Sequence, residues 1–268
     1  MDTQTGFAPV AGGQLYYEVS GVGHPLLLVH AGVADLRMWD DQVAYFAQHY
    51  RVIRYDERGF GRTTTENVSF SNRQDIFDLL AHLGVERTYI MGLSRGGVIA
   101  LDFTIEHPEM VDALINVAGG ISGFDAELLS EEMALEEQME AAENRNDFAA
   151  AAQLVVRGWA DGPFQPEGRA SQAVRDKVYA MTLDNYQNHF QESTDPQPLQ
   201  PPAISRLDAV AVPMLVIAGA LDESIPTAAM RHLAQSVPAA KLEVFPDTAH
   251  MVNMEQPERF NAIVGAFL

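Results

Sequence analysis

The chain has 268 residues, of which 47% are hydrophobic and 20% charged, a composition that can bury a sizeable core. Its formal net charge is −20, which argues against binding to nucleic acid or to an anionic membrane, since both require a basic face. It contains no cysteine, so disulfides and thiolate metal sites are excluded. We expect one large α/β domain with a subdomain inserted in it.

The first residues, Met1 to Gln4, have neither the positive charge nor the apolar block of a signal peptide. No apolar run approaches the roughly 20 residues needed to span a bilayer. We therefore expect a soluble cytoplasmic protein.

Apolar runs alternate with helical spacings over the first 120 residues. The runs that predict strands are 14–19, 26–29, 51–55, 88–91 and 111–117. Apolar residues at helical spacing predict helices between them, among them the sets Trp39, Val43, Phe46, Tyr50 and Ile76, Leu79, Leu80, Leu83. Strands separated by helices indicate parallel βαβ units in an open, doubly wound sheet.

From about residue 121 to 205 the strand signals vanish and the composition turns to Ala, Glu, Gln and Met. Helices are predicted around 130–144, 147–159 and 170–190, and a proline-rich segment closes the block. Alternation then resumes, with strands predicted at 214–217 and 242–245 and a last helix from Pro257. We predict a core of residues 1–120 and 206–268 and a helical cap of residues 121–205.

Residues 92–97, Gly-Leu-Ser-Arg-Gly-Gly, fit Gly-x-Ser-x-Gly, a sharp strand-to-helix turn that presents a serine for nucleophilic attack. Such a turn is strained, and it closes only if its neighbours lack bulk. Gly92 and Gly96 provide that room around Ser94. The apolar run before the turn and the helical run after it are the setting that the pattern requires.

A serine hydroxyl needs a base within hydrogen-bond reach, and the base needs an orienting group. Asp222 follows one predicted strand and His250 follows the next. Both therefore lie, like Ser94, at carboxyl ends of strands, where open α/β sheets bind ligands. Glu223 and Asp247 are near enough to be alternatives to Asp222, which fits best by position.

The chain resembles the α/β-hydrolase superfamily, in the branch with a helical cap inserted after the sixth strand. The resemblance covers nearly the whole sequence and rests on His30–Gly32, Asp56–Arg62, the turn at Ser94, Gly219–Pro226 and His250 with Pro257–Phe260. The order Ser94, Asp222, His250 is the order of that family. It implies a mostly parallel, doubly wound sheet of about eight strands. Residues 30–39 are most similar to carboxylesterases and enol-lactone hydrolases.

A tetrahedral intermediate needs donors for its oxyanion, and the amide of Arg95, at a helix N-terminus, can supply one. The family position implies the amide of Gly32 as the second donor, with Val33 as the alternative. The Arg95 side chain either binds a substrate carboxylate or pairs with an acid such as Asp56 or Glu57, and we favour the pairing. The resemblance also implies that His30 braces a loop.

Trp159, Phe164 and Met251 are the candidates for the substrate pocket, although aromatic and methionine side chains at helical spacing more often belong to a core. No cluster of histidines has metal-ligand spacing, and we predict no metal and no cofactor.

These residues predict a serine hydrolase of small carboxylic esters or lactones that forms an acyl-enzyme on Ser94. The same triad also serves carbon–carbon bond hydrolases and cofactor-free perhydrolases, and some ligand receptors with a hydrolase fold retain it. We expect a small-molecule partner, no nucleic acid and no membrane. Substrate identity and oligomeric state stay open at this point.

Overall fold

The computed structural model describes residues 2–190 and 195–268. Its main sheet runs through eight strands in the order β1-β2-β4-β3-β7-β8-β10-β11. Their bounds are β1 Thr3–Val10, β2 Gly13–Ser20, β3 His24–Val29, β4 Tyr50–Tyr55, β7 Thr88–Leu93, β8 Val111–Val117, β10 Met214–Gly219 and β11 Ala240–Phe245. The pairs β1–β2 and β2–β4 are antiparallel, and every later pair on this path is parallel. The predicted fold class is thereby confirmed.

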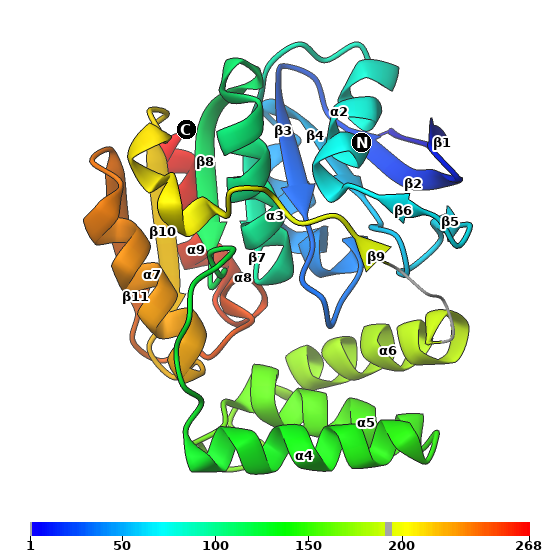
Figure 1. Cartoon of the computed structure of the whole chain (residues 1–268), viewed down its shortest axis with the longest axis vertical. Coiled ribbons are helices and arrows are strands. Elements are labelled where there is room, and N and C mark those ends of the chain that lie inside the picture. Colours follow the sequence, from blue (N-terminus) through cyan, green and yellow to red (C-terminus); the bar gives the residue numbers. More distant parts are fainter. Residues whose placement is uncertain (1, 191–194) are drawn as a thin grey trace.

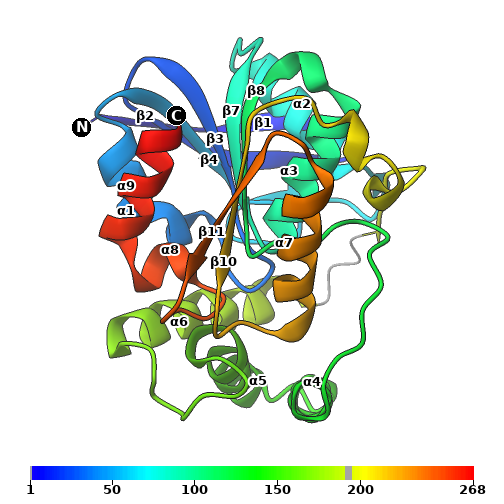
Figure 2. The same cartoon turned by 90° about the vertical axis from the view of Figure 1, so that its left-hand side faces the viewer.

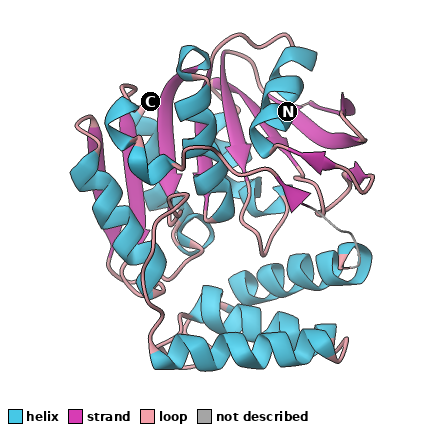
Figure 3. Ribbon diagram, viewed as in Figure 1, coloured by secondary structure: helices cyan, strands magenta, loops and turns pink. Residues whose placement is uncertain are grey.

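Helices cover both faces of the sheet (Figures 1 and 3). One face carries α2 (Asn72–His82), α3 (Arg95–Glu106) and α7 (Ser224–Ser236), and the other carries α1 (Asp40–Phe46) and α9 (Pro257–Phe267), as Figure 2 shows. Each face has its own buried apolar cluster. Because central parallel strands such as β3, β8 and β10 are covered on both sides, they read as continuous apolar runs in the sequence.

Between β8 and β10 the chain leaves the sheet and builds a separate helical layer (Figure 1). It consists of α4 (Ser130–Asn144), α5 (Phe148–Val155), the π-helix Val156–Asp161 and α6 (Gln172–His189). These helices agree with the three predicted patches. The exact division into core and cap stays a prediction, and residues 191–194 of the predicted cap lie outside the described residues.

Two expectations were wrong in detail. Tyr50 does not continue the helix of Trp39 and Val43, since α1 ends at Phe46 and Tyr50 begins β4, where it pairs with His24. The block 121–205 is not free of strands either, because Asp195–Pro196 (β9) pairs with Ser69–Phe70 (β6).

The remaining elements are short. They are β5 (Thr64–Thr65), α8 (Val252–Glu255) and the 3-10 turns Leu36–Trp39, Pro108–Met110, Ala203–Ser205 and Leu207–Ala209.

Candidate active site

Ser94 occupies a strained turn between β7 and α3. Its backbone lies at φ 57° and ψ −122°, a region that residues other than glycine rarely adopt. The turn is held because Ser94 N donates to Val117 O (2.9 Å) and Gly97 N donates to Ser94 O (2.8 Å). A methyl group on Gly92 would lie 2.1 Å from the carbonyl oxygen of Gly96, so only glycine fits there. The backbone therefore has the form that the sequence pattern predicts.

Asp222 and His250 meet just beyond the ends of β10 and β11. His250 Nδ1 lies 2.9 Å from each carboxylate oxygen of Asp222, and both side chains are almost fully buried. A carboxylate accepts, so Nδ1 carries the proton and Nε2 of the neutral ring is left as a base. Nε2 is buried and has no hydrogen-bond partner within the described part of the chain, the hydroxyl of Ser94 included.

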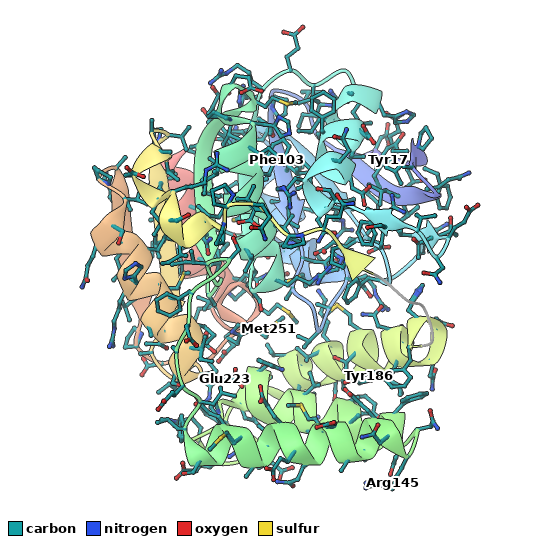
Figure 4. All side chains as sticks on the ribbon, in the orientation of Figure 1. Tyr17, Phe103, Arg145, Tyr186, Glu223 and Met251 are labelled. Carbon is teal, nitrogen blue, oxygen red and sulfur yellow. The ribbon has the colours of Figure 1, made fainter. Side chains whose placement is uncertain are left out.

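Several carboxylates surround this histidine. Burial lowers the pKa of His250, but Asp222, Glu223 and Glu255 outweigh it, and the pKa stands above its ordinary value. Burial is also the largest reason why the pKa of Glu223 rises to about 7, and its acidic neighbours Asp222, Glu132 and Glu136 raise it further, against the opposing effect of His250. Figure 4 shows Glu223 where the helical layer meets the rest of the molecule.

The loop after β3 forms a tight turn beside Ser94. Ala34 N donates to Ala31 O (3.1 Å), which places Gly32 and Val33 at the tip. The amide of Glu57 donates to His30 Nε2 (3.0 Å), so the proton of His30 is on Nδ1, which donates to Ala31 O (2.8 Å). His30 thus braces the loop, as the sequence implied. 

Gly32 lies directly against Arg95, the residue that follows Ser94. A methyl group added to Gly32 would lie 3.4 Å from Arg95 Cδ. Arg95 Nε donates to Glu57 Oε2 (2.9 Å), and Glu57 is only 2% exposed. The predicted pairing with an acid is confirmed, with Glu57 as the partner. Asp56 instead accepts from the amides of Leu36 and Arg62.

Helix α6 contacts two loops on this side of the site, the one after β3 that contains Val33 and Ala34 and the one after β4 that contains Gly61. Thr182 Oγ1 donates to Val33 O (2.8 Å), and Asn185 Nδ2 donates to Ala34 O (3.1 Å). Asn185 Oδ1 also accepts from Gly61 N (3.1 Å), and His189 Nε2 donates to Gly61 O (2.9 Å). Sequence reasoning missed these contacts, because polar residues on a polar helix carry no sign of what they face.

A cavity of about 210 Å³ lies at the same junction. Gly32, Val33 and Phe60 line it from the loops, and Tyr186 and Phe190 line it from the region of α6. Its walls are mainly apolar, and one of them is the loop that contains Gly32 and Val33, the two candidates for the second oxyanion donor.

The three pocket candidates lie in different surroundings. The ring of Trp159 is 5.0 Å from that of His250, centroid to centroid, and its carbonyl accepts from His250 N (3.2 Å). Met251 is fully buried in an apolar cluster, and Phe164 is 45% exposed. The π-helix that positions Trp159 is a form often found at functional sites.

Two further contacts join the helical layer to the loops around His250. Glu132, which is 1% exposed, accepts from the amide of Ser224 (2.6 Å), two residues beyond Asp222. Arg169 pairs with Glu255 (2.5 Å), whose other oxygen accepts from the amide of Ala249 (2.8 Å). The helical layer therefore contacts both halves of the candidate site.

Over residues 2–190 and 195–268, no group of three or more His, Cys, Asp or Glu side chains could hold a metal ion. In the same residues, no helix combines the length and apolar character needed to cross a membrane.

Known proteins are similar to this chain in sequence and in fold. The chain is 27% identical to 3-oxoadipate enol-lactonase 2 of Acinetobacter baylyi over 237 residues, which cover 87% of this chain and 84% of that protein. A crystal structure of a hydrolase from Pseudomonas aeruginosa superposes with a TM-score of 0.78 at 25% identity and covers 98% of this chain and 97% of its own. 

The enol-lactonase of Burkholderia xenovorans gives a TM-score of 0.76 at 24% identity and covers 98% of this chain and 99% of its own. That likeness shows the fold alone. Residues 24–257 match the family described as alpha/beta hydrolase fold, and the chain belongs to that family.

Proposed function

We propose that this chain is a serine hydrolase of small carboxylic esters or lactones, with Ser94 as nucleophile, His250 as general base and Asp222 as its orienting acid. The proposal is carried by the Asp222–His250 pair, which leaves Nε2 buried and without a hydrogen-bond partner among the described residues, at the carboxyl edge of the sheet that also presents Ser94 on its strained turn.

In the proposed reaction, Ser94 Oγ attacks the carbonyl carbon while His250 Nε2 takes the hydroxyl proton. The apposition of nucleophile and base is part of the proposal, since such hydrogen bonds often tighten only when substrate binds. Asp222 keeps the ring in the right tautomer and stabilises the imidazolium.

The amides of Arg95 and Gly32 stabilise the oxyanion, with Val33 as the alternative to Gly32. The intermediate collapses with the proton going from His250 to the leaving oxygen. That oxygen departs as an alcohol from an ester and stays attached to the acyl group of a lactone. Water activated by His250 then hydrolyses the acyl-enzyme.

The comparisons support the choice of esters and lactones. The Acinetobacter relative is named an enol-lactonase, and the solved structures of this fold include one titled naproxen esterase. Trp159 against His250, and the apolar cavity beside Gly32, are surfaces on which a small substrate could rest.

The test is a substrate panel assayed with the native chain and with Ser94→Ala. The panel contains p-nitrophenyl esters of graded chain length, lactones and a ring-fission dienoate, each with and without hydrogen peroxide. We expect ester or lactone turnover that falls by roughly 10⁴-fold or more in Ser94→Ala.

Other outcomes would overturn this choice. Turnover of the dienoate without ester cleavage would assign a carbon–carbon bond hydrolase, and turnover that depends on peroxide would assign a perhydrolase. Equal rates in both chains, or tight ligand binding without product, would indicate a receptor.

A further inference from the structure

The last strand of the sheet, β11, has one side without a neighbouring strand among the described residues. Within them it pairs only with β10, and Figure 2 looks onto this edge between α7 and α9. Four consecutive residues, 241–244, are exposed, and Leu242 and Val244 are apolar side chains exposed by 37% and 43%. An open, partly apolar edge strand is a template for pairing with another strand.

The hydrogen bonds to β10 fix which backbone groups of β11 point outward. Ala239 O accepts from Met214 N and Phe245 O accepts from Ala220 N, so the odd-numbered residues face β10. Backbone groups alternate along a strand, and the even-numbered residues therefore face away from the sheet.

Two of the outward groups already have partners. Ala240 N donates to Val237 O (3.0 Å), and Val244 O accepts from Arg259 Nη2 (3.4 Å). The outward groups that remain are the N–H and C=O of Leu242, the N–H of Val244 and the C=O of Ala240. These groups match one another across a twofold axis at Leu242. In that antiparallel arrangement Leu242 pairs with its own copy, and Val244 N–H donates to the copy's Ala240 C=O.

The charged side chains of Lys241 and Glu243 favour the same antiparallel register. With Leu242 opposite its copy, Lys241 lies opposite Glu243 in both halves of the interface, at the non-hydrogen-bonded positions where side chains are closest. A shift of the alignment by two residues in one direction places Lys241 opposite Lys241. A shift in the other direction places Glu243 opposite Glu243. The strand is thus complementary to itself in one register and repulsive in the two adjacent ones.

We propose that β11 is a homodimer interface, in which two copies of the chain join their sheets by antiparallel pairing of β11 about a twofold axis at Leu242. On an isolated edge strand, charged side chains such as Lys241 and Glu243 oppose pairing with a strand of another molecule. In this register they become opposite-charge pairs, and the apolar side chains of Leu242 and Val244 come next to those of the partner copy. Such an interface is isologous and closed, so it stops at the dimer.

The experiment is sedimentation velocity of the full chain over a range of concentrations, in about 0.15 M salt to screen the repulsion between two net charges. We expect a concentration-dependent dimer in the native chain. Glu243→Lys and Lys241→Glu each convert two attractive pairs into two repulsive pairs, and the dissociation constant should rise roughly tenfold or more. Glu137→Lys, on an exposed position of α4, makes the same change of net charge as Glu243→Lys and should leave the dimer intact.

A mixture gives the decisive result. Each single-reversal chain should be mainly monomeric alone, but a mixture of Lys241→Glu chains with Glu243→Lys chains should form a heterodimer, because opposite charges then meet at both pairs. The double reversal in one chain should restore the homodimer. Hydrogen exchange of the Leu242 and Val244 amides should slow as the native chain is concentrated.

The proposal is overturned if the native chain stays monomeric throughout, if a single reversal leaves dimerisation unchanged, or if the mixed chains do not associate. A dimer whose Leu242 and Val244 amides exchange at the same rate at all concentrations would also overturn it. The reversed residues are exposed, and circular dichroism of each variant checks that the fold is kept. Since no catalytic residue is touched, the result is independent of the proposed hydrolase activity.

Discussion

The two halves of the candidate active site are built by different physical means. The half around Ser94 and Gly32 is shaped mainly by backbone conformation and by uncharged hydrogen bonds to backbone groups, with one ion pair, Arg95–Glu57, beside them. The half around Asp222 and His250 is a group of buried ionisable side chains. Changes in side-chain volume should therefore mainly disturb the geometry of the first half, whereas changes in charge or pH should mainly disturb the protonation of the second.

The largest effect is expected from Asp222→Asn, in the charged half. An amide in place of the carboxylate can hold His250 in the wrong tautomer, and kcat should fall by about 10⁴-fold while the fold is kept. Steady-state kinetics with the best ester of the panel measures this. Asp247→Asn is the matched control at a neighbouring, exposed acid, and its kcat should be unchanged. Equal losses in both variants would contradict the assignment of Asp222.

Gly92→Ala should disrupt the half around Ser94, because it changes the backbone of the turn. The added methyl group would lie 2.1 Å from Gly96 O, a backbone atom that cannot move without opening the turn. The free energy of unfolding should fall by roughly 3 kcal/mol or more, measured by urea denaturation. Gly265→Ala in α9 is the control, since its methyl group meets only ordinary contacts at 3.5 Å. It should keep or slightly raise stability.

Thr182→Val tests whether the helical layer positions the loop at Gly32. Loss of the hydrogen bond to Val33 O should lower kcat about tenfold and change KM less, because the loop then holds the proposed oxyanion donor, the amide of Gly32 or of Val33, less well. Thr182→Ser keeps the hydroxyl and should recover most of the rate. Thr104→Val is the control, as this equally buried hydroxyl bonds to its own helix at Ala100 O. A similar loss of kcat in the control would show a general effect on stability instead.

Glu223→Gln should give the smallest effect on activity, a change in its pH dependence. The negative charge of Glu223 raises the pKa of His250, so its removal should move the acid limb of the kcat/KM profile to lower pH. An unchanged acid limb would contradict this. 

Stability should respond as well. The folded pKa of Glu223, about 7, lies above the ordinary glutamate value of 4.5, so the folded state binds more protons and the native chain loses stability as pH rises from about 4.5 to about 7. Above that window Glu223→Gln should be more stable by roughly 1–3 kcal/mol in thermal or urea unfolding. The two curves should converge at low pH, and a constant difference would contradict this origin.

The order of strands and helices was predictable because burial on both faces leaves long apolar runs, as in β3, β8 and β10. Strand β1 was not predicted, since most of its side chains are exposed and its apolar pattern is weak. The Asp222–His250 contact could be anticipated because each residue closely follows one of two neighbouring strands, β10 and β11. The bonds of Thr182 and Asn185 could not, because a polar residue does not reveal which distant carbonyl it will meet. The raised pKa of Glu223 likewise depends on Glu132 and Glu136, some 90 positions earlier in the chain.

The insertion of the helical layer between β8 and β10 also bears on the order in which the protein is made. Strands β1 to β8 are synthesised first, and with them Gly32, Ser94 and their backbone supports. In that partial sheet β8 is the last strand, and the side of β8 that will pair with β10 stays without a neighbour. It remains so until β10 leaves the ribosome, after the whole helical layer. We expect the nascent chain to expose, during that interval, the edge of the apolar strand β8 that faces away from β7. Chaperone binding should therefore be strongest while residues 118–213 are being translated, before His250, the proposed general base, has been made.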